Sequence, residues 1–170
     1  PAITPPTEAT GGKAARHAAS IDSALHPGAH FILTNSGVAC GDLAVASSAG
    51  STSDSFRIPS GDALYVMLAE RKCVLAIDGT LLAGLEEPGA TWLAKENIRL
   101  AAPILGEGEK LIGALLLAER NDREPYSPRE IQVVEAVAAQ IAVIYEKAWL
   151  QEQLRIERSR NEPAAAHEEP

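Results

Sequence analysis

One stretch near the C-terminus, Glu109–Leu154, constrains the fold of this 170-residue chain most, because it ends in a helical pattern that is too long for a small domain. Ser127 is a favourable N-cap, Pro128 suits the first helical position, and Glu130 completes a capping box. A helix from there to Glu157 has about 30 residues and measures roughly 45 Å, whereas a compact domain of this size is about 35 Å across. We therefore expect its C-terminal turns to project beyond the domain.

Two apolar stripes run along this predicted helix. The first should pack on the domain's own sheet, and its members recur at three- and four-residue spacing: Val134, Val137, Ile141, Ile144 and Ala148. A neighbouring stripe takes over near the C-terminal end, interrupted by Lys147, and consists of Val143, Leu150 and Leu154. Because a short helix without partners is marginal in water, we predict a homodimer in which this second stripe meets its copy around a twofold axis. The alternative is a frayed helix end with incidental leucines.

Upstream of the helix, the sequence predicts several strands. Two lie near His30–Thr34 and Leu43–Ser48 and form a hairpin, and a short buried strand lies at Cys73–Asp78. A strong strand pair, IRLAAPILG and KLIGALLLAER, flanks the turn Glu107–Glu109. Gly113 lies inside the second of these strands, which indicates a close approach by another backbone or by a ligand.

Helical patterns separate these strands. One helix is predicted at Lys13–Pro27, and another at Pro59–Lys72 with Ser60 as its N-cap, whereas Gly79–Asn97 is irregular with short helical turns. Adjacent strands with short connections favour an α+β fold with an antiparallel sheet of about five to six strands. The N- and C-terminal helices should cover one face, and loops and short helices should roof a pocket on the other.

The predicted pocket lies between the sheet and the roof at Gly79–Asn97. Trp92 combines an apolar ring with one N–H donor, which suits a ligand wall, and the alternative is that it fills the core. Four further residues are candidates for the pocket lining, with burial in the core as the alternative for each: Phe31, Leu81, Leu85 and Leu100. Because aromatic residues make up only 4% of the chain, we expect a small or aliphatic ligand, or none.

Charge and composition argue against several classes of protein. The net charge is −8 without a cluster of Lys or Arg, so we expect no nucleic-acid partner. No apolar stretch approaches the roughly 18 residues of a membrane span, no signal peptide is visible, and we expect a cytoplasmic protein. Cys40 and Cys73 cannot form a disulfide scaffold and are predicted to be buried reduced thiols. The chain begins with Pro1 rather than Met, so we expect a segment of a longer protein.

An ordered set of motifs in the C-terminal half resembles a GAF domain. These motifs are Pro103-Ile104, Leu111-Ile112-Gly113, Pro125-Tyr126-Ser127 and Glu146-Lys147-Ala148-Trp149-Leu150. The resemblance covers about Ala15 to Leu154 and implies a domain at residues 13–157, between disordered tails at 1–12 and 158–170. It implies a small-molecule sensing or regulatory domain of a multidomain bacterial signalling protein. The alternative is a dimerisation scaffold of the same family that binds no ligand.

The identity of the ligand stays unknown at this point. A bilin-binding member would need a cysteine followed by histidine, and neither Cys40 nor Cys73 is so followed. A haem would need an axial ligand in the pocket, whereas His26 and His30 are expected at turn or edge positions. No spacing of His, Cys, Asp and Glu suits a metal. Related methionine-sulfoxide reductases use several pocket cysteines, which this chain lacks. Its sequence also has no glycine motif that cradles phosphate and no nucleophile elbow, so we do not expect an enzyme.

Overall fold

Six strands form one antiparallel sheet in the order β3-β2-β1-β6-β5-β4. The computed structural model describes residues 21, 25, 27–35, 41–51 and 56–161. The strands are β1 His30–Asn35, β2 Leu43–Ala49, β3 Arg57–Ile58, β4 Leu75–Ala76, β5 Ile98–Leu105 and β6 Leu111–Ala118. The expected α+β fold with an antiparallel sheet is therefore confirmed, as are the hairpins β1–β2 and β5–β6.

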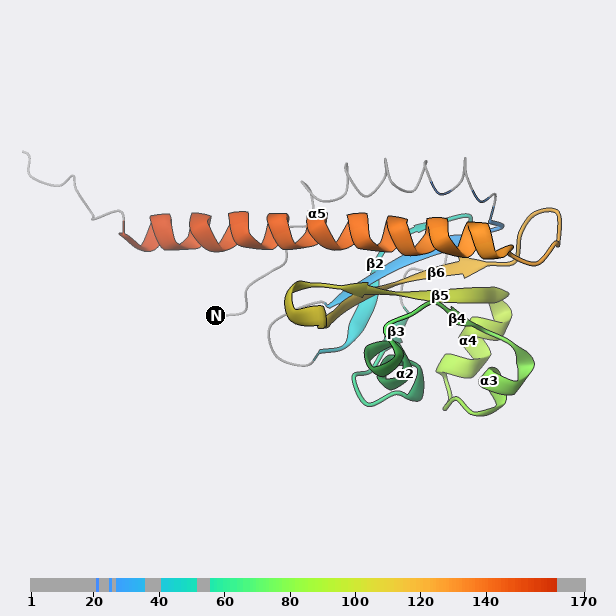
Figure 1. Ribbon diagram of the computed structural model, residues 1–170. Coiled ribbons are helices and arrows are strands. Elements are labelled where there is room, and N and C mark those ends of the chain that lie inside the picture. The colour runs from blue at the N-terminus through green and yellow to red at the C-terminus, as the bar shows by residue number, and fades with distance from the viewer. Residues whose placement is uncertain (1–20, 22–24, 26, 36–40, 52–55, 162–170) are drawn as a thin grey trace, which may run out of the picture.

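Helices cover both faces of this sheet. The long helix α5 crosses one face and continues beyond the end of the sheet, whereas three short helices lie against the other face (Figure 1). The helices are α2 Ala63–Arg71, α3 Gly79–Ala83, α4 Gly89–Lys95 and α5 Pro128–Asn161, and a 3₁₀ turn, η1 Glu107–Glu109, joins β5 to β6. The rest of the helix expected at Lys13–Pro27 lies outside the described residues, except that Ile21 and Leu25 are helical and buried on the α5 side.

Each face of the sheet has its own apolar core because successive strand residues point to opposite sides. On the α5 side, Ile32, Leu115 and Leu117 contact a helix seam that consists of Val134, Ala138, Ile141 and Ala142. On the other side, Phe31, Leu33 and Leu116 pack under the short helices. The predicted seam is correct at Val134 and Ile141, which are buried, and at Val137, which is half-buried and packs against the same core. Ala138 and Ala142 complete the buried contact, whereas Ile144 and Ala148 are only half-buried.

The predicted capping box of α5 is present. The Glu130 N–H donates to Ser127 Oγ at 3.3 Å, and the Ser127 N–H donates to Glu130 Oε2 at 2.8 Å. The Ser127 N–H and the Ser127 hydroxyl, which donates to Glu130 Oε2 at 2.7 Å, both lower the pKa of Glu130, and the Glu130 carboxylate also pairs with Arg120. Just before the cap, the Tyr126 hydroxyl donates to the Ala118 carbonyl at 2.7 Å, and burial raises the pKa of Tyr126 to about 12. The connection from β6 into α5 is thereby fixed at several points.

The structure corrects several local predictions. Asp62, not Ser60, caps α2, because its carboxylate accepts the Leu64 N–H at 2.8 Å. His30 is completely buried rather than at a turn or an edge, because β1 lies between β2 and β6. Cys73 is exposed rather than buried. It follows the left-handed residue Lys72, which ends α2, and it precedes an edge strand that pairs over two residues only.

The buried strand expected at Cys73–Asp78 is likewise only the two-residue strand β4. Cys40 lies outside the described residues. Two further elements differ from the sequence interpretation. The short edge strand β3 was not predicted, and α5 continues to Asn161, past Glu157 where we expected it to end. The irregular segment at Gly79–Asn97 contains the short helices α3 and α4, in line with the helical turns expected there.

We predict that Gly113→Ala destabilises the domain, because a Cβ at this position would collide with the carbonyl oxygen of Leu33 on the neighbouring strand β1. Forcing a methyl group into a packed site costs about 1–3 kcal/mol, so chemical denaturation should show a lower free energy of unfolding. The control is Gly61→Ala, where nothing lies within 4 Å of the added Cβ and the change should stay within about 0.5 kcal/mol. Equal effects of the two substitutions would contradict the close approach of β6 to β1.

Candidate functional site

The region under the predicted roof is occupied by aromatic side chains. The ring of Trp92, on α4, stacks on Phe56 with a centroid separation of 3.8 Å and an interplanar angle of 1°. It also meets the edge of Phe31, on β1, at 4.8 Å and 69°. Phe56 immediately precedes β3, one edge strand of the sheet, whereas the roof follows β4, the other edge strand. This contact therefore connects the roof to the opposite edge of the sheet. Trp92 therefore fills the core at this point, which is the alternative that the sequence left open.

The other predicted lining residues divide between the two faces. Phe31 is buried in the roof-side core, and Leu81 and Leu85 pack against that core with part of their surface exposed. The prediction for Leu100 is wrong, since it is buried on the α5 side of the sheet. A register irregularity between Ile98 and Leu100 shifts the alternation along β5, so that Leu100 points away from the roof.

A polar cleft of about 370 Å³ opens at one end of the sheet. Its walls come from four chain segments that meet there: Gly28 and Ala29 before β1, Gly50 after β2, residues 95–97 at the end of α4, and residues 118–121 with Arg123 after β6. Two glycines allow the backbones to meet, because a Cβ at Gly50 would collide with the Gly28 carbonyl oxygen. Sequence reasoning missed this cleft.

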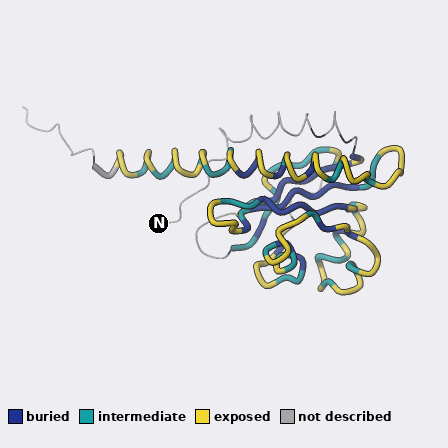
Figure 2. Tube along the Cα trace, in the orientation of Figure 1, coloured by how far each residue is buried: buried dark blue, intermediate teal, exposed yellow. Residues whose placement is uncertain are grey.

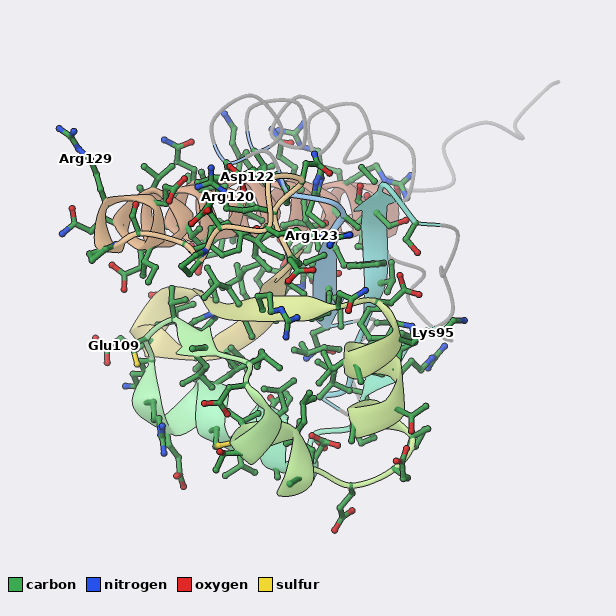
Figure 3. The ribbon with its side chains drawn as sticks, turned by 90° about the vertical axis from the view of Figure 1, so that its right-hand side faces the viewer. Lys95, Glu109, Arg120, Asp122, Arg123 and Arg129 are labelled. Atoms are coloured by element: carbon green, nitrogen blue, oxygen red, sulfur yellow. The ribbon has the colours of Figure 1, made fainter. Side chains whose placement is uncertain are left out.

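The charges in this polar cleft are unevenly satisfied. Glu96 accepts a hydrogen bond from the Ser51 hydroxyl at 2.8 Å, and Glu119 pairs with Arg99 at 3.2 Å. Arg120 pairs with both Asp122 and Glu130, and its bonds to Asp122 raise the pKa of the guanidinium. Figure 3 shows Arg120 next to Asp122.

Two basic side chains in the cleft are left without an acidic partner. Lys95 and Arg123 make no salt bridge to any residue that the structure describes. Both line the cleft, and Figure 3 labels Arg123 near the middle of the view and Lys95 toward its right-hand side. Within the described part of the chain, the cleft therefore presents two cations without a carboxylate partner, although the net charge of the chain is −8.

A second cleft, of about 300 Å³, lies along the edge of β5 beyond the short strand β4. Cys73, Val74 and Pro103 line it from the sheet side, and Glu135 and Ala139 line it from α5. Pro103 has no N–H to offer at this edge, which is the usual position of proline in a sheet.

The outer side of α5 carries large apolar side chains in contact with water. The three predicted dimer residues are exposed, with 64% of Val143, 55% of Leu150 and 55% of Leu154 accessible. Figure 2 shows exposed residues along much of this helix, and most continuously in the part that projects beyond the sheet. Trp149, which the sequence analysis named in a family motif but not as a dimer residue, is also exposed.

Across the described residues, no group of three or more His, Cys, Asp or Glu side chains is placed to hold a metal ion. None of the described helices combines the length and the apolar character that crossing a bilayer requires. These two findings apply only to that part of the chain.

Comparison with known proteins identifies the fold. A family model described as GAF domain matches residues 14–145. A GAF domain/HD domain protein from Geobacter sulfurreducens has a similar structure, with a TM-score of 0.68 and 15% identity over 85% of this chain and 96% of that chain. The GAF domain of a two-component sensor histidine kinase from Bacillus halodurans is also similar, with a TM-score of 0.65 and 17% identity over 84% of this chain and 97% of that chain.

A type II free methionine-R-sulfoxide reductase from Thermoplasma acidophilum is similar as well, with a TM-score of 0.57 and 13% identity over 83% of this chain and 95% of that chain. At these identities the likeness concerns the fold alone. No curated protein sequence matches the chain.

We predict that Trp92→Ala destabilises the domain, because it removes the stack on Phe56 and the edge contact to Phe31. A buried Trp→Ala substitution costs about 3–5 kcal/mol, and for this half-buried ring we expect about 2–3 kcal/mol in chemical denaturation. Trp149→Ala is the matched control, since its ring is 57% exposed and the change should stay within about 0.5 kcal/mol. If Trp92→Ala left the stability unchanged, the aromatic contact would not hold the roof on the sheet.

Proposed function

We propose that this chain, which belongs to the GAF domain family, is a regulatory domain of a multidomain bacterial signalling protein in which α5 joins two subunits. The observation that supports this role best is the exposed apolar side of a helix that continues past its own sheet. An uncovered stripe of this kind marks an interaction surface. The occupant that we propose is the same helix of a second copy.

The exposed residues of α5 follow the spacing of a coiled-coil seam. Alternating steps of three and four residues connect seven exposed positions: Val133, Ala136, Gln140, Val143, Lys147, Leu150 and Leu154. Such spacing keeps one side of a helix against a partner helix. At 3.6 residues per turn, this seam lies about 180° from the residues that face the sheet, so a partner helix would not compete with the sheet for α5. The seam thus extends the predicted stripe of Val143, Leu150 and Leu154 toward the start of α5.

The polar members of the seam limit its strength. Gln140 and Lys147 interrupt the apolar contact, and a polar residue at a core position sets register and partner number at some cost in stability. We therefore expect a weak dimer for the isolated domain. A parallel pair would direct both C-terminal ends of α5 to the same side, where a following output domain could respond to a change in helix rotation or register.

Replacement of Leu150 and Leu154 by Glu should abolish the dimer, because it places four negative charges in the seam of the assembled pair. Sedimentation equilibrium over a range of concentrations measures this directly, with the unchanged chain expected to associate and the double variant to stay monomeric. The control is Trp149→Glu with Ser159→Glu, which adds the same charge to the same helix segment at exposed positions about 100° or more around the helix from Leu150 and Leu154. A monomeric unchanged chain at high concentration, or equal association of all three proteins, would refute the proposed contact.

Small-molecule sensing under the roof is the second candidate function. One observation favours it: α3 has no fully buried residue and α4 has only Leu93, so the roof is lightly anchored and Trp92 contributes much of its contact. A ligand would have to part the stacked rings of Phe56 and Trp92 and would then contact both of them, so the two rings would form its wall. A cytoplasmic location and a regulatory rather than catalytic role belong to the same proposal. The exposed, unbridged thiol of Cys73 is consistent with a reducing compartment.

Native purification followed by mass spectrometry of the released small molecules tests this second candidate. If a ligand lies under the roof, it should be present in near-stoichiometric amount and should be lost from a Trp92→Phe, Phe56→Leu variant that removes the stack. Arg129→Gln is the control, because Arg129 is an exposed residue of the first turn of α5. A ligand that is retained by the aromatic variant, or the absence of any ligand, would contradict a site under the roof.

A further inference from the structure

We infer that the polar cleft at the end of the sheet is a binding site for a small organic anion with a phosphate or carboxylate group, held between Lys95 and Arg123. The site is separate from the space under the roof. The role of the bound anion as a signal rests on the proposed regulatory function, whereas the binding site itself is inferred from the charges of the cleft.

The basic side chains that line the cleft, Lys95, Arg120 and Arg123, outnumber the acidic ones. The two acidic side chains are already engaged, Glu96 with Ser51 and Glu119 with Arg99. Their lone pairs are therefore partly used by donors of the protein. Lys95 and Arg123 face the same space from different segments and have no described carboxylate to neutralise them. An anion placed between them would supply the missing partner.

The loop that carries Arg123 is fixed in position by its own hydrogen bonds. Arg123 has a left-handed backbone, with φ of 60°, which is uncommon for a residue with a long side chain. Its N–H donates to the Arg120 carbonyl at 2.9 Å, and the Arg120 side chain is clamped by Asp122 and Glu130. Arg120 is thus used to hold the turn together, whereas Arg123 lines the cleft. A preformed position lowers the entropy cost of binding.

The opposite wall is fixed by backbone hydrogen bonds. Asn97 also has a left-handed backbone, with φ of 52°, and its carbonyl accepts the Glu119 N–H at 2.8 Å. The Gly28 N–H donates to the Glu119 carbonyl at 2.8 Å, which joins the start of β1 to the end of β6. Lys95, the last residue of α4, therefore lies two residues before a backbone position that is fixed by a hydrogen bond to β6's C-terminal side.

The chemistry of the lining indicates the class of ligand. Arginine offers a planar fork for the oxygens of a carboxylate or phosphate, and lysine adds a mobile point charge. The side-chain amides of Asn97 and Asn121 can donate to further oxygens or accept from hydroxyl groups of the ligand. A cleft of about 370 Å³ accommodates a metabolite rather than a macromolecule.

A ligand in this cleft would connect the two parts of the molecule that matter for regulation. Lys95 belongs to α4, which carries Trp92 of the roof, and Arg123 belongs to the loop that leads into α5. Binding between them would couple the position of the roof to the beginning of the helix that we propose as the subunit contact. Such coupling requires that the anion binds more tightly to one arrangement of α4 and α5 than to another.

The test uses inorganic phosphate and succinate as probes on the intact chain, followed by NMR titration of the backbone amides at low ionic strength. We expect saturable shifts of the Asn97, Asn121 and Arg123 amides with at least one probe. Lys95→Gln and Arg123→Gln should each weaken that binding about tenfold or more, because each removes a charge-assisted hydrogen bond. Arg129→Gln is the control for general charge effects, since Arg129 lies on α5 and does not line the cleft.

Each outcome of this titration has a defined meaning. Saturable binding that is weakened by the two cleft variants and unaffected by Arg129→Gln supports the site, and the stronger of the two probes identifies phosphate or carboxylate as the preferred group. Shifts that do not saturate with either probe, or an equal loss in the Arg129→Gln variant, would overturn the inference. Because sedimentation measures the dimer separately, failure of the anion site and failure of the proposed subunit contact can be told apart.

Discussion

Burial of the central strands on both faces is the constraint on which the rest of this structure depends. In β1, the four residues from His30 to Leu33 are all buried, and β6 is buried along almost its entire length. A sheet of this kind needs a cover on each side. One cover is α5, and the other is the set of short helices with their aromatic contact. The glycine at position 113 allows β6 to lie close against β1 in the middle of this arrangement.

Two surfaces follow from this constraint. Because α5 uses one side to cover the sheet, its opposite side is left to water or to a partner, and that side has the spacing of a helix–helix seam. Because the strand ends cannot be covered by helices that lie flat on the faces, the loops at one end form a cleft instead. The roof, in contrast, is closed by Phe56 and Trp92 in the described structure. The seam and the polar cleft are therefore open, as is the smaller cleft beside β5.

Local patterns allowed much of the fold to be predicted. The capping box of Ser127 and Glu130 fixed the start of α5, and the alternation of apolar residues located the hairpins. Leu100 was assigned to the wrong face because a single irregularity in β5 reverses the alternation, and nothing in the local sequence marks it. The cleft could not be predicted, since Lys95 and Arg123 come together only through the strand order. The partner of Trp92 was missed for the same reason, because Phe56 immediately precedes an edge strand that is too short to produce a pattern.

The central claim is that the outer side of α5 meets its copy in a second subunit. The most direct measurement is disulfide cross-linking in a chain with Cys40→Ser, Cys73→Ser and Leu150→Cys. In a parallel helix pair, seam residues of the two copies lie within the distance that a disulfide can bridge, so mild oxidation should give covalent dimers. Ser159→Cys in the same background places the thiol about 180° around the helix from Leu150 and should give no covalent dimer. Equal cross-linking of both variants, or none in either, would contradict the account.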